Sequence, residues 1–296
     1  MQVLKAFGLM LSLAFGGASL VAHAADDVNP TSGKPTVQIQ QVRNATVKIT
    51  FEGKTFLVDP FLAKKGTYPG FEGTFHSELR NPLVDLPISA DQVMDGVDAV
   101  IVTHTHLDHW DGGDHKHIPT TLPLFVQHES DAKLIRGQGY TNVHILAETT
   151  TFEGVQLTKI GGQHGTDEMY GNKPLGEALG EAMGIVLRAP GAKTVYLVGD
   201  TVWRNEVDDA FVKFKPDVII MNTGDARMVG YVGAIIMGKD DVLRAYQAMP
   251  SSTIVATHMD AINHMTLSRA GLMEHVKQHG IEDRVRIPAD GETLTF

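Results

Sequence analysis

A cluster of metal-type side chains, meaning the histidine and aspartate side chains that commonly bind metal ions, directly follows an apolar run. No other feature of the sequence restricts the possible folds of this chain as strongly. The run, residues 98–103, reads Asp-Ala-Val-Ile-Val-Thr and predicts a buried strand. The next six residues include His104, His106, Asp108 and His109. Loops at strand ends are where α/β proteins place functional groups. The cluster therefore predicts a metal site on the loop that follows this strand.

The chemistry of the cluster narrows the choice of metal. Imidazole and carboxylate ligands suit zinc, manganese or iron, and thiolate is excluded because the chain has no cysteine. The alternative is a polar surface loop of hydrogen-bonded histidines, which is the interpretation we give to His115, His117 and His128. A site for two metals needs more donors than one loop supplies, so further ligands must come from other loops on the same edge.

Three further predicted strands end at residues of the same kind. Glycines at positions 161 and 162 allow a sharp turn that brings the next histidine toward a ligand. Any one of these residues alone is commonly structural, but their joint placement indicates one site. The three pairs are residues 155–160 before His164, residues 194–199 before Asp200, and residues 252–257 before His258.

Taken in chain order, these residues resemble the signature of the metallo-β-lactamase superfamily, and the resemblance covers nearly all of the chain after residue 24. It implies two divalent metal ions, with zinc preferred and manganese or iron as alternatives. The implied ligands are His104, His106 and His164 for the first metal, Asp108, His109 and His258 for the second, and Asp200 as the bridging carboxylate.

Two finer features follow from the same resemblance. Asp59, before Pro60, matches an early aspartate that supports the site from behind the ligands, although a turn residue before proline is the alternative. Asp59-Pro60 and the segment from His258 to His264 are most similar to the branch that includes ascorbate-6-phosphate lactonase.

Departures from related families exclude several activities. Zinc β-lactamases that hydrolyse antibiotics place cysteine at the position of Asp200, and flavodiiron proteins place glutamate at the position of His106 and carry a flavin domain. Nuclease branches generally need a cationic surface for phosphates, whereas the formal net charge here is -10. We therefore expect a small-molecule substrate and no nucleic-acid partner; the sequence does not determine the oligomeric state.

Composition agrees with one large domain. The chain has 296 residues, of which 43% are hydrophobic, and this is enough to form a substantial core. The charged fraction of 20% argues against disorder. Periodicity predicts only the α/β class, and the resemblance implies a four-layer αββα sandwich with two mixed sheets flanked by helices. The predicted strands are residues 36–41, 46–51, 55–58, 99–103, 124–127, 155–160, 184–187, 194–198, 218–222 and 253–257. The predicted helices are residues 131–137, 239–248 and 268–279.

The N-terminus predicts export. A short basic start, an apolar stretch and the small-residue site Ala22-His23-Ala24 are typical of a secretory signal peptide over residues 1–24. An uncleaved membrane anchor is the alternative, and the glycines within the apolar stretch disfavour it. We expect a single hydrolase domain over residues 25–296, periplasmic or secreted, with no stable membrane anchor after cleavage.

The predicted reaction is attack by a metal-bridging hydroxide on a small ester, lactone or amide. Asp108 and Asp200 are expected to orient the hydroxide, and His264 is a candidate proton donor or substrate contact, with a surface position before a helix as its alternative. Asn222 and Asp225 are candidates for supporting the ligands.

Two other functions remain open: a phosphodiesterase with the same metals, and a metal-binding protein without turnover. The phosphodiesterase requires a cation near the metals. Residues 64–85 predict a loop over the metals, and residues 167–180 predict a flexible second wall. The candidate cations are Arg43, Arg80, Arg204 and Arg227.

Overall fold

Two mixed sheets form the centre of the computed structural model, which describes residues 37–112 and 117–296. Within these residues each sheet has seven strands. The first sheet contains, in spatial order, β14 (Thr293–Thr295), β1 (Gln38–Arg43), β2 (Thr46–Phe51), β3 (Lys54–Val58), β4 (Ala99–Val102), β5 (Leu124–Val126) and β6 (Val143–Ile145). The second contains β13 (Val285–Arg286), β12 (Thr253–Thr257), β11 (Val218–Asn222), β10 (Val195–Leu197), β9 (Gly184–Arg188), β8 (Val155–Ile160) and β7 (Thr149–Phe152).

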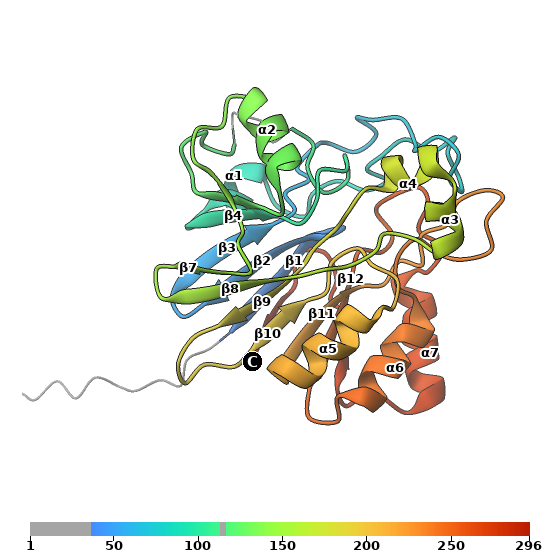
Figure 1. The fold of residues 1–296 in the computed structure, drawn as a ribbon. Coiled ribbons are helices and arrows are strands. Elements are labelled where there is room, and N and C mark those ends of the chain that lie inside the picture. Colours follow the sequence, from blue (N-terminus) through green and yellow to red (C-terminus); the bar gives the residue numbers. More distant parts are fainter. Residues whose placement is uncertain (1–36, 113–116) are drawn as a thin grey trace, which may run out of the picture. The chain divides into compact units, whose positions relative to one another are not determined.

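Helices cover the outer face of each sheet, which confirms the predicted four-layer αββα sandwich (Figure 1). Two further short helices, α3 and α4, lie in the connection between β8 and β9. On the first sheet pack α1 (Ala90–Met94) and α2 (Glu129–Gly137), on the second pack α5 (Asn205–Phe214), α6 (Lys239–Ala248) and α7 (Arg269–His279), and the connection contains α3 (Asp167–Gly171) and α4 (Lys173–Leu179).

Alternating side chains explain the layers. In β2, Val47, Ile49 and Phe51 are fully buried and point into the core between the sheets, where they meet Leu157 and Ile185 of the second sheet. The helices instead present residues at helical spacing. In α5, the apolar side chains three and four positions apart are buried against the outer face of the second sheet.

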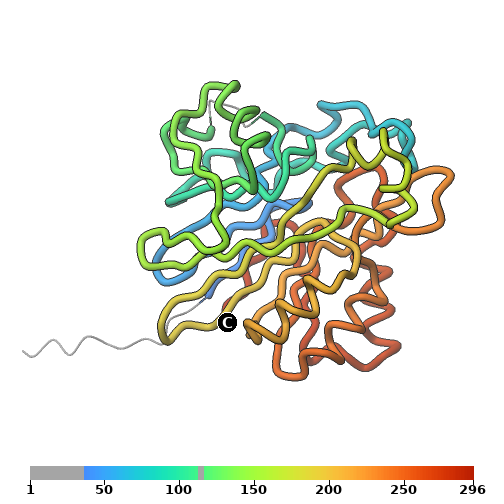
Figure 2. The backbone as a smooth tube through the Cα atoms, in the orientation of Figure 1, coloured from blue at the N-terminus to red at the C-terminus, as the bar shows by residue number. Residues whose placement is uncertain are grey.

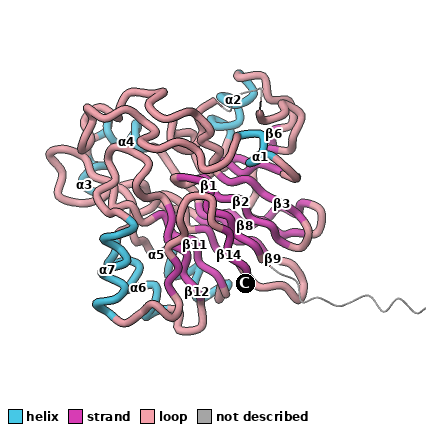
Figure 3. The backbone as a smooth tube through the Cα atoms, turned by 180° about the vertical axis from the view of Figure 1, so that it is seen from behind, coloured by secondary structure: helices cyan, strands magenta, loops and turns pink. Residues whose placement is uncertain are grey.

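Strand direction brings the predicted ligand loops to one edge of each sheet. In the first sheet β2 is antiparallel to both β1 and β3, and β3 and β4 are parallel, so β1, β3 and β4 all end on the same side. In the second sheet β8, β10, β11 and β12 likewise share one direction, because β9 runs antiparallel between β8 and β10. Seen from behind, loops gather at the end of the sheets where α3 and α4 lie (Figure 3).

Several elements were not predicted. Helices α1 and α5 were not predicted, nor were strands β6, β7, β13 and β14, each of which has only two to four residues. The prediction that residues 167–180 are a flexible stretch was wrong, because these residues form α3 and α4. The Thr166 side chain accepts a hydrogen bond from the Met169 N–H at the start of α3, and a proline lies in the first turn of α4. The Thr166 cap and the proline favour helix in a segment whose glycines suggested mobility.

The predicted signal peptide, residues 1–24, lies outside the described residues. Within residues 37–112 and 117–296, no helix has the length and apolar character that crossing a membrane requires.

Candidate metal centre

The loop after β4 is fixed to the end of β3 by Asp59. The Thr103 backbone N–H donates to Asp59 Oδ1 at 2.7 Å, and the Thr103 hydroxyl donates to Asp59 Oδ2, also at 2.7 Å. Asp59 itself has a φ of 47°, a left-handed conformation that aspartate tolerates better than most residues. Asp59 therefore sets where the chain leaves β4 and enters the histidine cluster.

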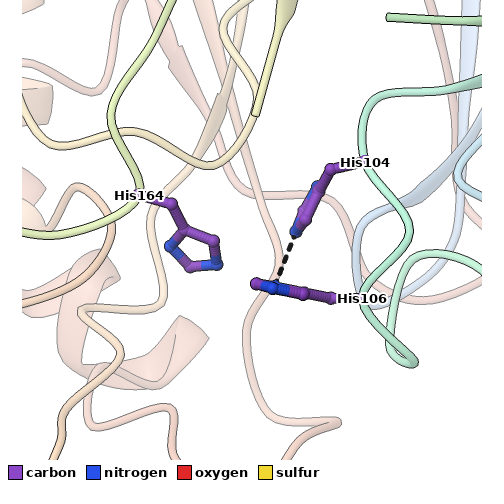
Figure 4. A group of neighbouring side chains, drawn as sticks. All are labelled: His104, His106 and His164. Carbon is purple, nitrogen blue, oxygen red and sulfur yellow. Dashed lines mark hydrogen bonds between the residues drawn. The ribbon is translucent and has the colours of Figure 1, made fainter. Parts of the chain in front are cut away.

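His104, His106 and His164 form the first group of side chains, and their ligand-type atoms lie within 4.8 Å of one another. They come from two loops that approach from opposite sides (Figure 4). His104 Nε2 lies 3.0 Å from His106 Nδ1. The outward-facing nitrogens are used elsewhere: His106 Nε2 lies 3.0 Å from the Ala178 carbonyl, and His164 Nδ1 lies 3.0 Å from the Ile235 carbonyl. These bonds place the ring protons on the outward-facing nitrogens, so the lone pairs of His106 Nδ1 and His164 Nε2 point inward.

Asp108, His109 and His258 form the second group, also within 4.8 Å. His109 Nε2 lies 3.1 Å from His258 Nε2, and His258 Nε2 lies 3.5 Å from Asp108 Oδ2. His109 Nδ1 lies 2.8 Å from Asp59 Oδ2, so Asp59 accepts its proton and the lone pair of Nε2 faces the group.

Asp200 lies between the two groups. Its Oδ2 is 3.0 Å from His109 Nε2, 3.4 Å from His258 Nε2 and 3.6 Å from His164 Nε2. The other carboxylate oxygen, Oδ1, accepts a hydrogen bond of 2.6 Å from the Asn222 side-chain amide at the end of β11. Asn222 thus holds the carboxylate in the orientation that presents Oδ2 to both groups.

This donor set fits divalent cations. His109 donates its Nδ1 proton to Asp59, so when its ring is neutral its Nε2 faces Asp200 Oδ2 as one acceptor facing another at 3.0 Å. Both side chains are buried, and such a contact is unfavourable unless a proton or a cation lies between the two atoms. Nitrogen and carboxylate oxygen are the donors that zinc, manganese and iron accept.

Burial and charge together shift the pKa values in the cluster. Burial lowers the pKa of His164 to about 4, and burial with the nearby charge of His109 holds the pKa of His104 well below its usual value. Burial alone would raise the pKa of Asp200, but the charges of His109 and His258 hold it well below the usual range. The opposite balance holds for His109, whose pKa is raised well above normal because nearby carboxylates outweigh burial. His104 and His164 are therefore neutral at pH 7, as metal ligands must be.

His264 lies beside the cluster and is buried, with 5% of its surface exposed, which rules out the alternative of a surface histidine before a helix. Its ring packs edge-on against Phe71, with 5.1 Å between ring centroids, and its Nδ1 has no hydrogen-bond partner within the described part of the chain. His264, His106, Asp108 and His164 line a cavity of about 210 Å³. The cluster therefore opens into a pocket that can accept a small molecule.

A larger cavity, of about 780 Å³, lies between residues 62–68 and 85–91. None of the side chains of the two groups lines it. The smaller cavity is lined by His106, Asp108 and His164, and we therefore assign the chemistry to it.

Asp225 does not belong to the cluster. Its carboxylate pairs with Arg227 at 2.9 Å and accepts a hydrogen bond from the Thr266 hydroxyl. The prediction that Asp225 supports the ligands was wrong, because the chain after β11 turns away from the cluster beyond Asn222. His117 pairs with Asp91, as expected for a histidine outside the site.

Asn44, in the turn between β1 and β2, was missed by the sequence analysis. Its side-chain amide donates to the Asp108 carbonyl at 2.8 Å, and its own carbonyl accepts from the His258 N–H at 3.1 Å. Asn44 thus connects the two loops of the second group. Its φ of 58° suits asparagine in a tight turn, but such a turn gives no sign in the sequence that distant loops bind to it.

Replacing Asn44 by glycine is expected to weaken metal binding at the second group by roughly tenfold to a hundredfold, the usual effect of removing a group that orients ligands. Glycine tolerates the left-handed backbone at this position, so the substitution removes only the amide. Metal titration of the stripped protein measures the effect. Equal affinity and equal metal content in the Asn44→Gly variant and the unsubstituted protein would show that the connection is not needed.

Comparison with known proteins identifies the family of the chain. A family model described as the Beta-lactamase superfamily domain matches residues 54–259. The match spans β3 to His258. It includes the six residues of the two groups and also Asp200. The chain belongs to this superfamily, and its two sheets with flanking helices are the metallo-β-lactamase fold.

Its relatives place the chain among the UPF0173 metal-dependent hydrolases. UPF0173 protein YddR of Bacillus subtilis is 43% identical over 260 residues, which cover 88% of this chain and 100% of that protein. The structure of a possible metal-dependent hydrolase from Veillonella parvula is 49% identical, with a TM-score of 0.87, and covers 88% of this chain and all of that one. These relatives do not test the resemblance to the ascorbate-6-phosphate lactonase branch, which stays a prediction.

A third relative has a named reaction. The structure of isothiocyanate hydrolase from Delia radicum gut bacteria is 45% identical to this chain, with a TM-score of 0.85. The alignment covers 88% of this chain and 99% of that one. The chain is therefore a metal-dependent hydrolase with relatives similar over almost their whole length.

Proposed function

We propose that the chain is a di-metal hydrolase, with zinc as the preferred metal and manganese or iron as alternatives. The shared position of Asp200 Oδ2, 3.4 Å from His258 Nε2 and 3.6 Å from His164 Nε2, supports a bridging role between two cations. When bound, two cations polarise the scissile group and lower the pKa of water, which supplies the attacking hydroxide. The first is assigned to His104, His106 and His164, the second to Asp108, His109 and His258, and Asp200 to both.

The protein's own groups have separate tasks. Asp108 and Asp200 balance the cationic charge and accept a hydrogen bond from the nucleophile. Burial lowers the pKa of His264 to about 4, so its ring is neutral at pH 7 and has one N–H to donate. We assign His264 to contact with the substrate's heteroatom, because it lines the cavity beside Asp108.

The observation that carries this proposal is the lining of the cavity next to the donor set. Beyond the metal-type residues and His264, the lining is mostly apolar, and no lysine or arginine of the described chain contributes to it. A phosphodiester would meet no cation other than the metals, which disfavours the phosphodiesterase alternative. The four candidate arginines pair elsewhere: Arg43 with the Phe61 and Val84 carbonyls, Arg80 with the Gly66 and Thr67 carbonyls, Arg204 with Asp167, and Arg227 with Asp225.

The cavity favours an uncharged substrate with an electrophilic carbon. Esters, lactones and amides meet this description, and so does an isothiocyanate, the group in the name of the 45% identical relative. For an isothiocyanate, water adds to the central carbon and gives a thiocarbamic acid, which then breaks into an amine and carbonyl sulfide. The intact donor set favours an active hydrolase over a metal-binding protein without turnover, since none of the seven metal-ligand side chains is missing.

Hydrolysis assays on the purified protein test the proposal, with isothiocyanate, lactone, ester and phosphodiester probes and His106→Ala as the matched control. We also propose that the protein is exported. N-terminal sequencing of protein purified from the periplasmic fraction tests whether the chain is cleaved after Ala24. We expect turnover of an isothiocyanate or an acyl probe that falls to background in the control. Turnover of the phosphodiester alone would overturn the proposed hydrolase activity. So would the absence of turnover of every probe in protein shown to contain two metals.

A further inference from the structure

Three segments that are far apart in sequence build one wall of the 210 Å³ cavity. They are the loop around residue 74, the loop around residue 228 and the segment after β12 that contains His264. An isolated antiparallel bridge joins Thr74 to Met228, and the Arg227 N–H donates to the His264 carbonyl at 3.0 Å. The first two loops lie at the same end of the molecule as α3 and α4 (Figure 2).

Phe71 and Met228 present apolar side chains on this wall, and Leu175 and Leu179 of α4 with Ile235 complete the lining. Phe71 is half-buried and is not part of any of the buried clusters described for the chain. The next aromatic side chain in the loop contrasts with Phe71: Phe75 is 39% exposed and does not line the cavity. Phe71 therefore faces the space next to the metal-type residues without being needed for the core.

Asn263, next to His264, fixes the loop that carries Phe71. Its side chain is buried and uses both ends. Oδ1 accepts from the Phe71 N–H at 3.2 Å and from the Asn81 amide at 2.7 Å. Nδ2 donates to the Thr74 hydroxyl at 2.9 Å and to the Phe75 carbonyl at 2.8 Å. The Asn263 N–H returns a bond of 2.9 Å to Asn81 Oδ1.

The backbone before Phe71 is also tightly restricted. A Cβ atom at Gly70 would lie 2.4 Å from the Ser77 carbonyl oxygen and 2.5 Å from the Leu79 carbonyl oxygen. Only glycine allows the chain to pass so close to itself. The backbone that carries Phe71 is thus held by Asn263 and Gly70, and the ring packs against His264 outside the core clusters.

We propose that Phe71 determines substrate specificity, by contacting the apolar substituent of an uncharged substrate, and that Asn263 is the positioning residue that holds it. The inference rests on the proposed function, since the substituent lies in the cavity only when the reacting carbon is at the metal-type residues. The substrate class is an electrophile with an aryl or alkyl group, because the wall offers Phe71, Met228 and Leu175 and no charge.

Binding of two ketones, which have a polarised carbonyl carbon but no bond that water can cleave, tests the inference separately from catalysis. The Kd values of 4-phenylbutan-2-one, which carries a benzyl group, and of butan-2-one are measured by calorimetry on the metal-loaded protein and on Phe71→Ala, Asn263→Ala and Phe75→Ala variants. We expect the unsubstituted protein to prefer the benzyl compound. Phe71→Ala should reduce this preference about tenfold, as expected for lost apolar contact in a pocket, and Phe75→Ala should leave it unchanged. Metal content should be equal in all four proteins.

The double variant separates positioning from general damage. If Asn263 acts through Phe71, the Phe71→Ala/Asn263→Ala variant should lose no more benzyl preference than Phe71→Ala alone. Additive losses would overturn the role of Asn263. No benzyl preference in the unsubstituted protein, or an unchanged preference in Phe71→Ala, would overturn the role of Phe71. Absence of turnover of every isothiocyanate and acyl probe, together with a Phe71-dependent preference, would refute the proposed reaction and leave the binding inference supported.

Discussion

Replacing Asp200 by asparagine is expected to lower kcat/KM by on the order of 10³-fold. The reason is the shared position of its Oδ2, which lies within 3.6 Å of nitrogen atoms from both groups, including His164 and His258. An amide has nearly the same shape, but it lacks the negative charge that, in the proposed function, would hold two cations close together. A Lewis acid supplies several kcal/mol of transition-state stabilisation, and each 1.36 kcal/mol lost lowers the rate about tenfold.

Metal content and a matched control distinguish this explanation from misfolding. The Asp200→Asn protein should bind less metal while keeping its secondary structure, because Asn222 can still bond the amide oxygen. Asp283→Asn is the control, since Asp283 is exposed and bonds Tyr246 far from the site in sequence and in the fold. An Asp200→Asn protein with both metals and full activity would show that Asp200 is not a ligand.

Removing the metals is expected to lower the melting temperature by about 5 to 10 °C. A ligand at 100 times its Kd stabilises the folded state by about 2.7 kcal/mol, and 1 kcal/mol moves the melting temperature by about 2 to 4 °C in a domain of this size. The chain has no cysteine, so no disulfide replaces this contribution. Without cations, Asp200 and His109 must meet as buried acceptors or take up a proton.

Thermal melts with and without a strong chelator measure the effect, and adding zinc back should restore the original value. His106→Ala should show a smaller change on chelation, because one ligand of the first group is already missing. An unchanged melting temperature in protein shown to be free of metal would mean that the cluster does not depend on metal for its stability.

The ligand loops could be predicted because each follows a short apolar strand. Asp200 and His258 come directly after β-branched runs, and parallel strands that end on one edge bring the residues after them together. The same pattern predicted Asn222, at the end of β11. It failed for Asp225, only three residues later, because a pattern along the strand says nothing about how the chain turns after it.

The surroundings of the ligands could not be predicted in the same way. Asn44 and Asn263 act on residues 64 and 192 positions away in sequence, through single amide groups. Asparagine is also common in ordinary turns, so its type carries little information. The burial of His264 could not be predicted either, because it depends on contact with Phe71, which lies on a loop from another part of the chain.

By itself the sequence determined the donor set, the α/β class and the order of the ligand loops, and through its resemblance the superfamily. These properties reside in residue type and in short apolar runs, which are local. Only the tertiary structure decided which nitrogen of each histidine faces inward, that residues 167–180 form α3 and α4 beside the cavity, and that no arginine of residues 37–112 and 117–296 lines it. Those properties depend on contacts between distant segments, and their energies are set by distance and burial, which spacing along the chain does not contain.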